Sequence, residues 1–552
     1  MGKHLKEYLI QYLNYLMINN IVRYYFTIKD LKLIQIIFLI IRKFIRKKNN
    51  KIIIFKFLLS NYKFEFNFKR SQTLFNNNKV HFLNHSFNIL NEFTSEDDLI
   101  SYNLNYFDYL NNFDKKNKIY FLKSIIIWIK KNKNKHKLDS YPTSLRIVNW
   151  IYFIKYYNLK LKSNNLILLT LYNDANILYK NIEYHLLGNH LFKNAKALIF
   201  AGMFFKSQIS NKWLKKGLKI FEKQILEQIL KDGGHYELSP MYHSIFLLDL
   251  IEIYLLFKIN NFKINYLPRI KEKILKMYHW LMIMKHPDGS IPFFNDTSEN
   301  VSLTFKELEN IIFTIFINEN TIKNNRKKTF IKSLENSGYH NINLSNFYLI
   351  ADIGNIAPKF LPGHSHADTL SFELSIFNKK FIVNSGTSTY ENNTLRYLQR
   401  STCFHSTLTY NNKNSSDVWK SFRVGKKAYA NVLLISENKD NATLIGSHDG
   451  YSSLFKKIIH ERKFYVDRNT FRVIDSINHG FNTCLIRYYL HPSVLIKDQN
   501  IYFDNKKINF SINGGNYVIK QSDWYNKFYH SEKNHIIEIK PYNNKIKFEI
   551  NI

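Results

Sequence analysis

The sequence predicts a multidomain α+β protein in which a helical half precedes an antiparallel β half. Three observations lead to this prediction. The chain has 552 residues, which is too long for one compact core and indicates two or three domains. Residues 86–335 carry apolar side chains at spacings of three and four, the pattern of amphipathic helices. From residue 340 onward, short segments rich in β-branched and aromatic residues follow one another, the pattern of strands.

Residues 1–85 are expected to form a basic helical arm. The longest uncharged stretch near the N-terminus, residues 33–41, is far shorter than the roughly 20 residues that cross a bilayer. The basic residues that follow it are Arg42, Lys43, Arg46, Lys47 and Lys48. Such a segment fits peripheral contact with a membrane or packing against the next domain, and the second is favoured. No small-residue cleavage site follows an apolar run, so a signal peptide is not indicated.

The helical domain is predicted to span residues 86–335 and to consist of helical hairpins packed as a bundle or toroid. Its amphipathic segments are residues 121–131, 166–184, 190–205, 213–230 and 241–257. One helix start is clearly marked, because Ser239 suits the N-cap and Pro240 suits the first helical position.

A β-sandwich domain is predicted over residues 340–552. Its expected strands are residues 347–354, 369–376, 380–384, 406–410, 429–435, 462–467 and 471–477. They follow closely without helices between them, which implies antiparallel pairing in a sandwich. Alternation places Leu370, Phe372, Leu374 and Ile376 on one face of a strand.

The composition indicates a folded chain with a large positive charge. Hydrophobic residues make up 45% and aromatic residues 16%, which excludes a disordered chain. The formal net charge of +36 attracts polyanions such as nucleic acid, anionic lipid or acidic polysaccharide. Because Lys, Asn and Ile are abundant throughout, the charge is equally well explained as solvated surface decoration. It permits an acidic partner without identifying one.

One polar cluster lies just before predicted strands of the β domain. His364 and His366 are separated by one residue on extended backbone and so point to the same side, and His405 also precedes a strand. Such a set can bind one metal ion. The alternative is that these histidines are hydrogen-bonded at a domain interface. The cysteines indicate no further metal site and no disulfide framework, because Cys403 and Cys484 are isolated.

A second cluster lies at helix ends of the helical domain, where it suits a site at the mouth of a bundle. Asn189 and His190 open one helix, and Tyr242 falls in the first turn of another. The positive end of the helix dipole would favour the phenolate form of Tyr242. The alternative is that Tyr242 packs beneath the β domain.

A third cluster combines Arg146, Asn149 and Trp150. Arg binds carboxylates in bidentate fashion and Trp stacks on sugar faces, so the three together suit an acidic sugar. Equally, Arg146 could cap a helix and Trp150 could belong to the core.

Short motifs occur in a specific order along most of the chain. They are residues 102–110, Ser144-Leu145-Arg146-Ile147-Val148-Asn149-Trp150, Gly188-Asn189-His190, residues 233–243, Asp288-Gly289-Ser290-Ile291-Pro292, residues 363–372, Ser385-Gly386-Thr387, Arg400-Ser401-Thr402 and His405. Together they resemble the heparinase II/III family of polysaccharide lyases. The resemblance implies an α/α toroid followed by an antiparallel β-sandwich, with the active site in the cleft between them. It also implies cleavage of an acidic, uronate-containing glycan by β-elimination.

The resemblance implies roles for individual residues. Asn189 and His190 would bind the carboxylate of the sugar. Tyr242 would serve as base, acid or both, with His364 opposite as partner base or charge stabiliser. Substrate contacts or positioning would come from Arg146, Glu237 and Tyr390.

A structural zinc ion is also implied, and here the chain departs from the family pattern. Relatives bind zinc through the second His of a His-x-His motif, an Asp and a later His, and the matching residues are His366, Asn384 and His405. An uncharged Asn carbonyl is a poorer zinc ligand than a carboxylate. We therefore expect a weakened structural site, completed by Asp368 or water, or no zinc at all.

Two other functions compete with the lyase. A non-cleaving glycan-binding or surface-polysaccharide maturation protein would keep the same cleft. Chemistry is favoured by the joint presence of Asn189, His190, Tyr242 and His364. Nucleic-acid binding rests on charge alone and is not expected, because no nucleic-acid-binding motif is present. The family resemblance implies the periplasm or cell envelope, and the cytoplasm is the alternative. The glycan, the endo or exo mode and the oligomeric state are left open.

Overall fold

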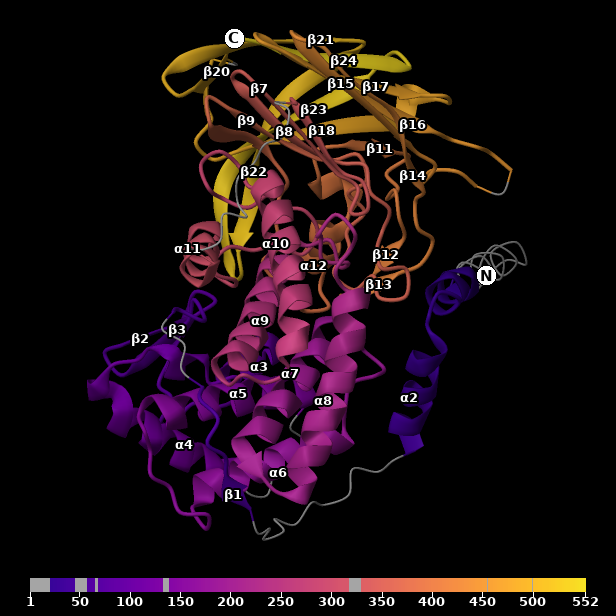
Figure 1. Ribbon diagram of the computed structural model, residues 1–552. Coiled ribbons are helices and arrows are strands. Elements are labelled where there is room, and N and C mark those ends of the chain that lie inside the picture. Colours follow the sequence, from indigo (N-terminus) through magenta and orange to yellow (C-terminus); the bar gives the residue numbers. More distant parts are fainter. Residues whose placement is uncertain are drawn as a thin grey trace, which may run out of the picture.

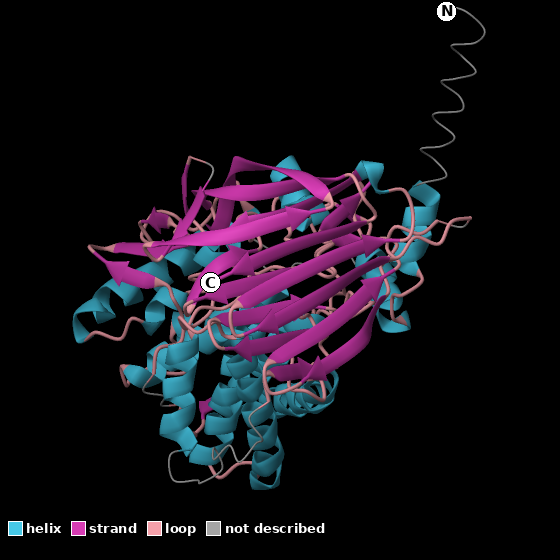
Figure 2. Ribbon diagram, turned by 90° about the horizontal axis from the view of Figure 1, so that it is seen from above, coloured by secondary structure: helices cyan, strands magenta, loops and turns pink. Residues whose placement is uncertain are grey.

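A computed structural model of the chain describes residues 20–44, 57–64, 68–132, 139–316, 329–453, 455–498 and 500–552. Helices dominate the N-terminal half and strands the C-terminal half (Figure 1). Figure 2 shows the strands running side by side across the helices beneath them. The predicted α+β fold class is confirmed.

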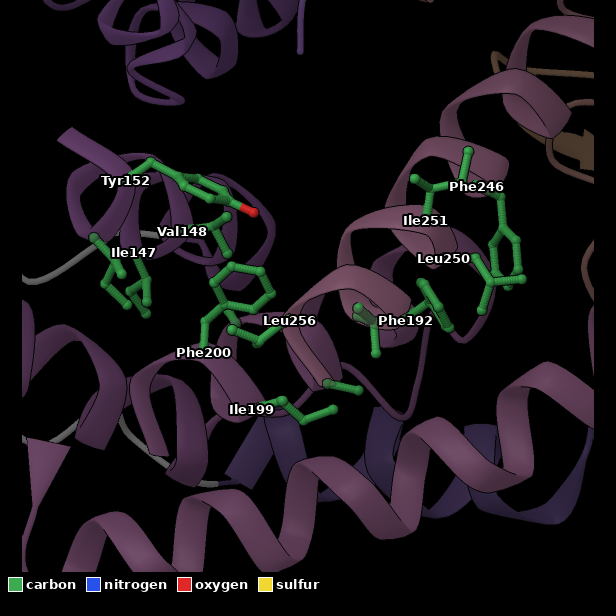
Figure 3. Packing of buried hydrophobic residues seen from close by; sticks show 14 of the residues in the cluster. Ile147, Val148, Tyr152, Phe192, Ile199, Phe200, Phe246, Leu250, Ile251 and Leu256 are labelled. Atoms are coloured by element: carbon green, nitrogen blue, oxygen red, sulfur yellow. The ribbon is translucent and has the colours of Figure 1, made fainter. Parts of the chain in front are cut away.

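The helical half is built from long helices around one shared hydrophobic core. Its helices are α3 (Asp98–Leu104), α4 (Lys118–Asn132), α5 (Ser140–Tyr156), α6 (Leu166–Lys180), α7 (Gly188–Phe204), α8 (Gln208–Glu227), α9 (Pro240–Ile259), α10 (Leu267–Met284) and α11 (Phe305–Phe316). Val148 of α5, Phe192 and Phe200 of α7 and Leu250 of α9 pack in this core (Figure 3). Because α5, α7 and α9 are buried on nearly all sides, they form its centre.

Two central helices begin at the interface with the β half. At the start of α9, the Ser239 hydroxyl accepts a hydrogen bond from the backbone N–H of Tyr242 at 3.2 Å, and Pro240 takes the first position, so the predicted cap is confirmed. Helix α7 begins at Gly188, where φ is +55° and a Cβ would lie 2.5 Å from Oε1 of Glu237. A side chain at Gly188 would therefore displace Glu237.

The β half is a sandwich of two antiparallel sheets. The nine-stranded sheet contains, in spatial order, β22 (Gly515–Lys527), β23 (His530–Pro541), β18 (Cys484–Leu490), β10 (Lys379–Val383), β9 (Phe372–Ile376), β8 (Phe347–Asp352), β7 (Tyr339–Leu344) and β6 (Ile331–Leu334), with β11 (Leu408–Tyr410) paired to β18. The eight-stranded sheet contains β14 (Ala430–Glu437), β15 (Asn441–His448), β16 (His460–Asp467), β17 (Thr470–Ile477), β24 (Lys545–Asn551), β21 (Lys506–Asn513), β20 (Asn500–Phe503) and β19 (Leu495–Lys497).

Strand β9 shows how the sandwich is attached to the helices. Leu370 and the apolar residues of β9 are fully buried in the core between the two sheets, which confirms the predicted face. The opposite face of β9 is buried as well, against the helical half. There Glu373 and Ser375 form hydrogen bonds of 2.8 Å with the two ring nitrogens of His286. The polar face of the strand is therefore satisfied by the other domain and not by water.

The prediction of a helical arm up to residue 85 is wrong from Phe57 onward. Residues 20–28 and α2 (Leu33–Phe44) are helical, but short strands follow: β1 (Leu58–Leu59), β2 (Leu74–Asn76), β3 (Lys79–Phe82) and β4 (His85–Phe87). Asn77 and Asn78 both have positive φ and form a tight hairpin turn between β2 and β3. Residues 1–19, 45–56 and 65–67 of the expected arm lie outside the described residues.

The described arm packs against both halves of the protein. The Arg23 guanidinium donates to both carboxylate oxygens of Asp417 in the β half, each at 2.8 Å. The Lys32 ammonium pairs with Glu227 of α8 and lies 3.8 Å from the ring centroid of Phe360. Packing on the neighbouring domains, the favoured prediction, is confirmed. Within the described ranges, no helix is long and apolar enough to cross a membrane.

Candidate active site

The predicted catalytic residues meet where the helical half faces the β half. Tyr242 comes from the first turn of α9, and its ring centroid lies 4.0 Å from that of His364, which precedes β9. The hydroxyl of Tyr242 is 3.1 Å from that of Tyr390. Glu237 lies behind this group, with Oε2 at 3.6 Å from Nε2 of His364. Residues far apart in sequence thus form one polar cluster at the interface.

Asn189 and His190 lie beside this cluster, at the start of α7. The Asn189 side chain donates one N–H to the Tyr141 hydroxyl at 3.0 Å and keeps a second N–H for a ligand. Its backbone N–H donates to Glu237 at 3.1 Å. The positive end of a helix dipole at this place favours an anionic group.

His190 adds a positive charge to the start of α7. Burial opposes that charge, but the Glu183 carboxylate, 3.4 Å from Nδ1, outweighs it and raises the pKa of His190. The side chain keeps 35% of its surface exposed, so it remains accessible to a ligand.

Asp296 organises the site, although no sequence pattern indicated it. Its carboxylate accepts hydrogen bonds from Nδ1 of His364 and Nε2 of His366, both at 2.8 Å. Arg396 donates to both carboxylate oxygens. Burial alone would raise the pKa of Asp296, but Arg396 and the two histidines hold it well below its usual value. Because an ionised carboxylate only accepts, Nδ1 of His364 is the nitrogen that donates to it, and in the neutral imidazole the lone pair therefore lies on Nε2.

The expectation that the helix dipole would favour the phenolate form of Tyr242 is wrong. Burial raises the pKa of Tyr242 well above its ordinary value, and Tyr390 and Asp296 add to the rise. The dipole of α9 would lower the pKa of this hydroxyl, but its effect is outweighed, because the ring is buried near groups that disfavour another negative charge. Tyr242 therefore holds its proton near neutral pH.

The prediction that Arg146 contacts a sugar is also wrong. The side chain is fully buried in α5, where its guanidinium pairs with Asp174 at 2.9 Å and lies 4.3 Å from the ring centroid of Trp128. Trp150 is equally buried and belongs to the core. The alternative of a structural role holds for both residues.

The proposed zinc ligands lie together but do not converge on one point. Nδ1 of His366 is 3.2 Å from Nε2 of His405, close to the separation of about 3.3 Å expected for two nitrogens on one tetrahedral zinc ion. The side-chain oxygen of Asn384 instead faces the opposite ring nitrogen of His405, Nδ1, at 3.3 Å. Among the described residues, no group of three His, Cys, Asp or Glu side chains could hold a metal. The set therefore does not fit a structural zinc with three protein ligands.

Asp368, the alternative ligand, does not complete the set. One of its carboxylate oxygens accepts a hydrogen bond from the backbone N–H of Asn295 at 3.3 Å. Burial raises the pKa of Asp368 to about 6, so the carboxylate is less available as an anionic ligand than an exposed one.

Comparison with known proteins covers both halves of the chain. Residues 128–324 match the family described as Heparinase II/III N-terminus, and residues 326–543 match Heparinase II/III-like, C-terminal. The heparin-sulfate lyase of Bacteroides stercoris is 27% identical over 325 residues, covering 53% of this chain and 44% of that protein. That of Bacteroides thetaiotaomicron is 27% identical over 344 residues, covering 54% and 46%. The aligned part thus spans a little under half of each curated relative.

Solved structures support the same fold. The crystal structure of heparinase III superposes with a TM-score of 0.63 at 18% identity, covering 83% of this chain and 77% of that one. A heparan sulfate lyase from Pedobacter heparinus gives a TM-score of 0.54 at 16% identity, covering 85% and 79%.

Proposed function

This chain belongs to the heparinase II/III-like family, and we propose that it is a polysaccharide lyase that cuts an acidic, uronate-containing glycan by β-elimination. The observation that carries the proposal is the cluster at the interface. There the protonated Tyr242 and the oriented His364 lie against each other, beside the positive start of α7. The relatives named heparin-sulfate lyases make a sulfated glycosaminoglycan the first substrate to test.

The reaction needs three kinds of group. The C5 hydrogen of a uronate is barely acidic while the adjacent carboxylate is charged, so that carboxylate must first be bound to stabilise the developing negative charge. A base then removes the C5 proton. The electrons of the C5–H bond form a C4–C5 double bond, the C4–O4 bond breaks, and an acid protonates the leaving O4.

The residues of the cluster supply each group. Asn189 and His190 bind the substrate carboxylate at the start of α7. Nε2 of His364 is the base, because Asp296 holds the proton on Nδ1. Tyr242 is the acid, because its raised pKa keeps the proton on the hydroxyl. The two rings are adjacent, with their centroids 4.0 Å apart.

Two further residues position the proposed base, the proposed acid and the carboxylate-binding residues. Glu237 holds the start of α7, since one carboxylate oxygen accepts from the Asn189 backbone. The other oxygen lies 3.6 Å from Nε2 of His364, where it stabilises the imidazolium that forms when this nitrogen takes the C5 proton. Tyr390 shares a hydrogen bond with Tyr242 and lies where it can also touch the sugar.

Ultraviolet absorbance at the band of an unsaturated uronate tests the proposal. The purified protein is incubated with heparan-like, alginate-like and other acidic polysaccharides. A rise on one polymer is expected, since no water enters the products and a conjugated uronate remains. Binding of a polymer without any rise would point instead to the non-cleaving glycan-binding protein.

The histidine pair next to the site is proposed to bind zinc weakly or not at all. Only His366 and His405 offer nitrogens to one point, and Asn384 adds no charge. We expect elemental analysis to find well under one zinc per chain after washing with a chelator. One zinc per chain after such washing would contradict this expectation.

A lipid surface is the second partner that we propose, for the N-terminal arm. Although one side of the arm packs on the protein, Ile21, Tyr25 and Leu33 are 62%, 63% and 71% exposed. Arg42 and Lys43 in the last turn of α2 supply positive charge for anionic headgroups. Co-sedimentation with anionic but not with neutral vesicles, abolished by Leu33→Asp, is the expected result. Equal recovery with and without vesicles would contradict it.

A further inference from the structure

A cavity of about 160 Å³ extends from the catalytic cluster into the helical half. Tyr141, Tyr242 and Tyr390 line it on the side of the site. Helices α7 and α9 both start at the interface and run away from it, so their later residues lie deeper. Lys196 follows Asn189 by seven residues on α7, which places it roughly 10 Å further along the helix axis.

Charged side chains close the deep end of this cavity. The Lys196 ammonium lies 2.7 Å from Asp249 and also pairs with Glu252. Arg70 pairs with the other oxygen of Glu252, and its guanidinium lies 3.6 Å from the ring centroid of Tyr152. The side chains of Lys196 and Arg70 are each only 5% exposed. These buried and packed ion pairs form the wall of the cavity at its deep end, among the described residues.

Among the described cations that line the cavity, Lys193 is the most exposed. It lies on α7 between Asn189 and Lys196, lines the cavity, and is more exposed than the cations beneath it, at 12%. Its ammonium contacts the two oxygens of one carboxylate, Asp249, at 2.8 and 2.7 Å. An ammonium has three N–H donors, so at least one is left for a hydroxyl or acidic group.

The size and the walls of the cavity fit a short piece of saccharide. Its volume corresponds to about five water molecules of about 30 Å³ each, the space of about one sugar ring. Leu83, Leu99 and Met241 provide apolar walls, against which the faces of sugar rings can pack.

We propose that this cavity is a chain-end pocket, in which Lys193 binds the polar groups of the terminal sugar of the acidic glycan. This inference rests on the proposed lyase function and adds the mode of action. A blind pocket beside Tyr242 admits the end of a chain but not its middle. The enzyme therefore releases short unsaturated units from chain ends.

The size of the products tests the pocket. With the polymer that gives an absorbance rise, mass spectrometry should show unsaturated mono- or disaccharides from the first minutes, while the viscosity of the polymer falls slowly. Early oligosaccharides of many lengths with a rapid fall in viscosity would overturn the pocket and leave the lyase function intact. If no polymer gave an unsaturated product, both the chain-end pocket and the lyase function would be overturned.

The variant Lys193→Met tests the role of the ammonium. Its KM for a short acidic oligosaccharide should rise about tenfold or more, with kcat changed less than about threefold, since a ground-state contact is lost. Folding should persist, because Asp249 keeps its pairing with Lys196. Lys380→Met is the matched control: Lys380 is also buried but lies in β10 and lines no part of the cavity. An unchanged KM in Lys193→Met, with normal thermal unfolding, would contradict the assignment.

Discussion

Tyr242→Phe is expected to lower kcat by about 10²- to 10⁴-fold, the usual contribution of a positioned acid or base. The substitution removes only the hydroxyl, which bonds to Tyr390 at 3.1 Å, and keeps the ring against His364. Loss of that one hydrogen bond costs about 1 kcal/mol of stability, so the protein should fold normally. KM should change little, because the carboxylate is bound by groups on α7.

Tyr390→Phe is the matched control for this experiment. It removes the same hydroxyl–hydroxyl bond from the other side but leaves the proposed acid in place, so kcat should fall less than about tenfold. Initial rates are followed by the absorbance of the unsaturated product, and thermal unfolding is recorded for both variants. Activity of Tyr242→Phe equal to that of the unaltered chain would remove Tyr242 from the chemistry.

The pH profile adds a second readout. Because the pKa of Tyr242 is raised well above 10, its hydroxyl stays protonated throughout the neutral and mildly alkaline range. Loss of activity between pH 8 and pH 10 would therefore have to come from another group.

The division of the chain into helices and strands was predictable because it depends on local periodicity. The cap at Ser239 and the buried face of β9 follow from patterns within a few residues, and both are confirmed. The arm from Phe57 onward was mispredicted, because its short strands depend on the Asn77-Asn78 turn and carry few residues from which to read a period.

The site was only partly predictable, because its geometry depends on contacts between domains. Asp296 binds His364 and Arg396, which are 68 and 100 residues away, and no local pattern encodes such contacts. Arg396 lies on a short helix, α12 (Thr394–Arg400), inside the half that was expected to hold strands only. The prediction for Arg146 was wrong for a different reason. Helix α5 is buried on almost every side, so the spacing of its residues could not distinguish an Arg that points into the core from one that faces a cleft.

Asp296→Asn is expected to lower kcat about 10²-fold or more, by acting through His364. The side-chain amide of Asn can donate to Nδ1 of His364, which would move the imidazole proton to Nε2 and remove the proposed base. The same change leaves the buried Arg396 without a counter-charge, which costs about 3–5 kcal/mol of stability. Activity and stability must therefore be separated.

Asp475→Asn separates them, because Asp475 has the same kind of partners inside the β-sandwich. Its carboxylate accepts from Nε2 of His460 at 2.7 Å and from the buried Arg462 at 2.7 and 3.0 Å. Both aspartates have a pKa held below the usual value by their partners, although burial opposes this. The stability that each contributes is present above the unfolded-state pKa of about 4 and is lost in acid, so both variants are compared at neutral pH.

The two variants should lose similar free energies of unfolding but differ in catalysis. Assayed well below its unfolding temperature, Asp475→Asn should keep kcat within about threefold of the unaltered chain, whereas Asp296→Asn should not. The folded fraction of each variant is measured at the assay temperature by circular dichroism. If both lost activity in proportion to their unfolded fraction, Asp296 would be a structural residue only, and the proton on His364 would have to be held by something other than this carboxylate.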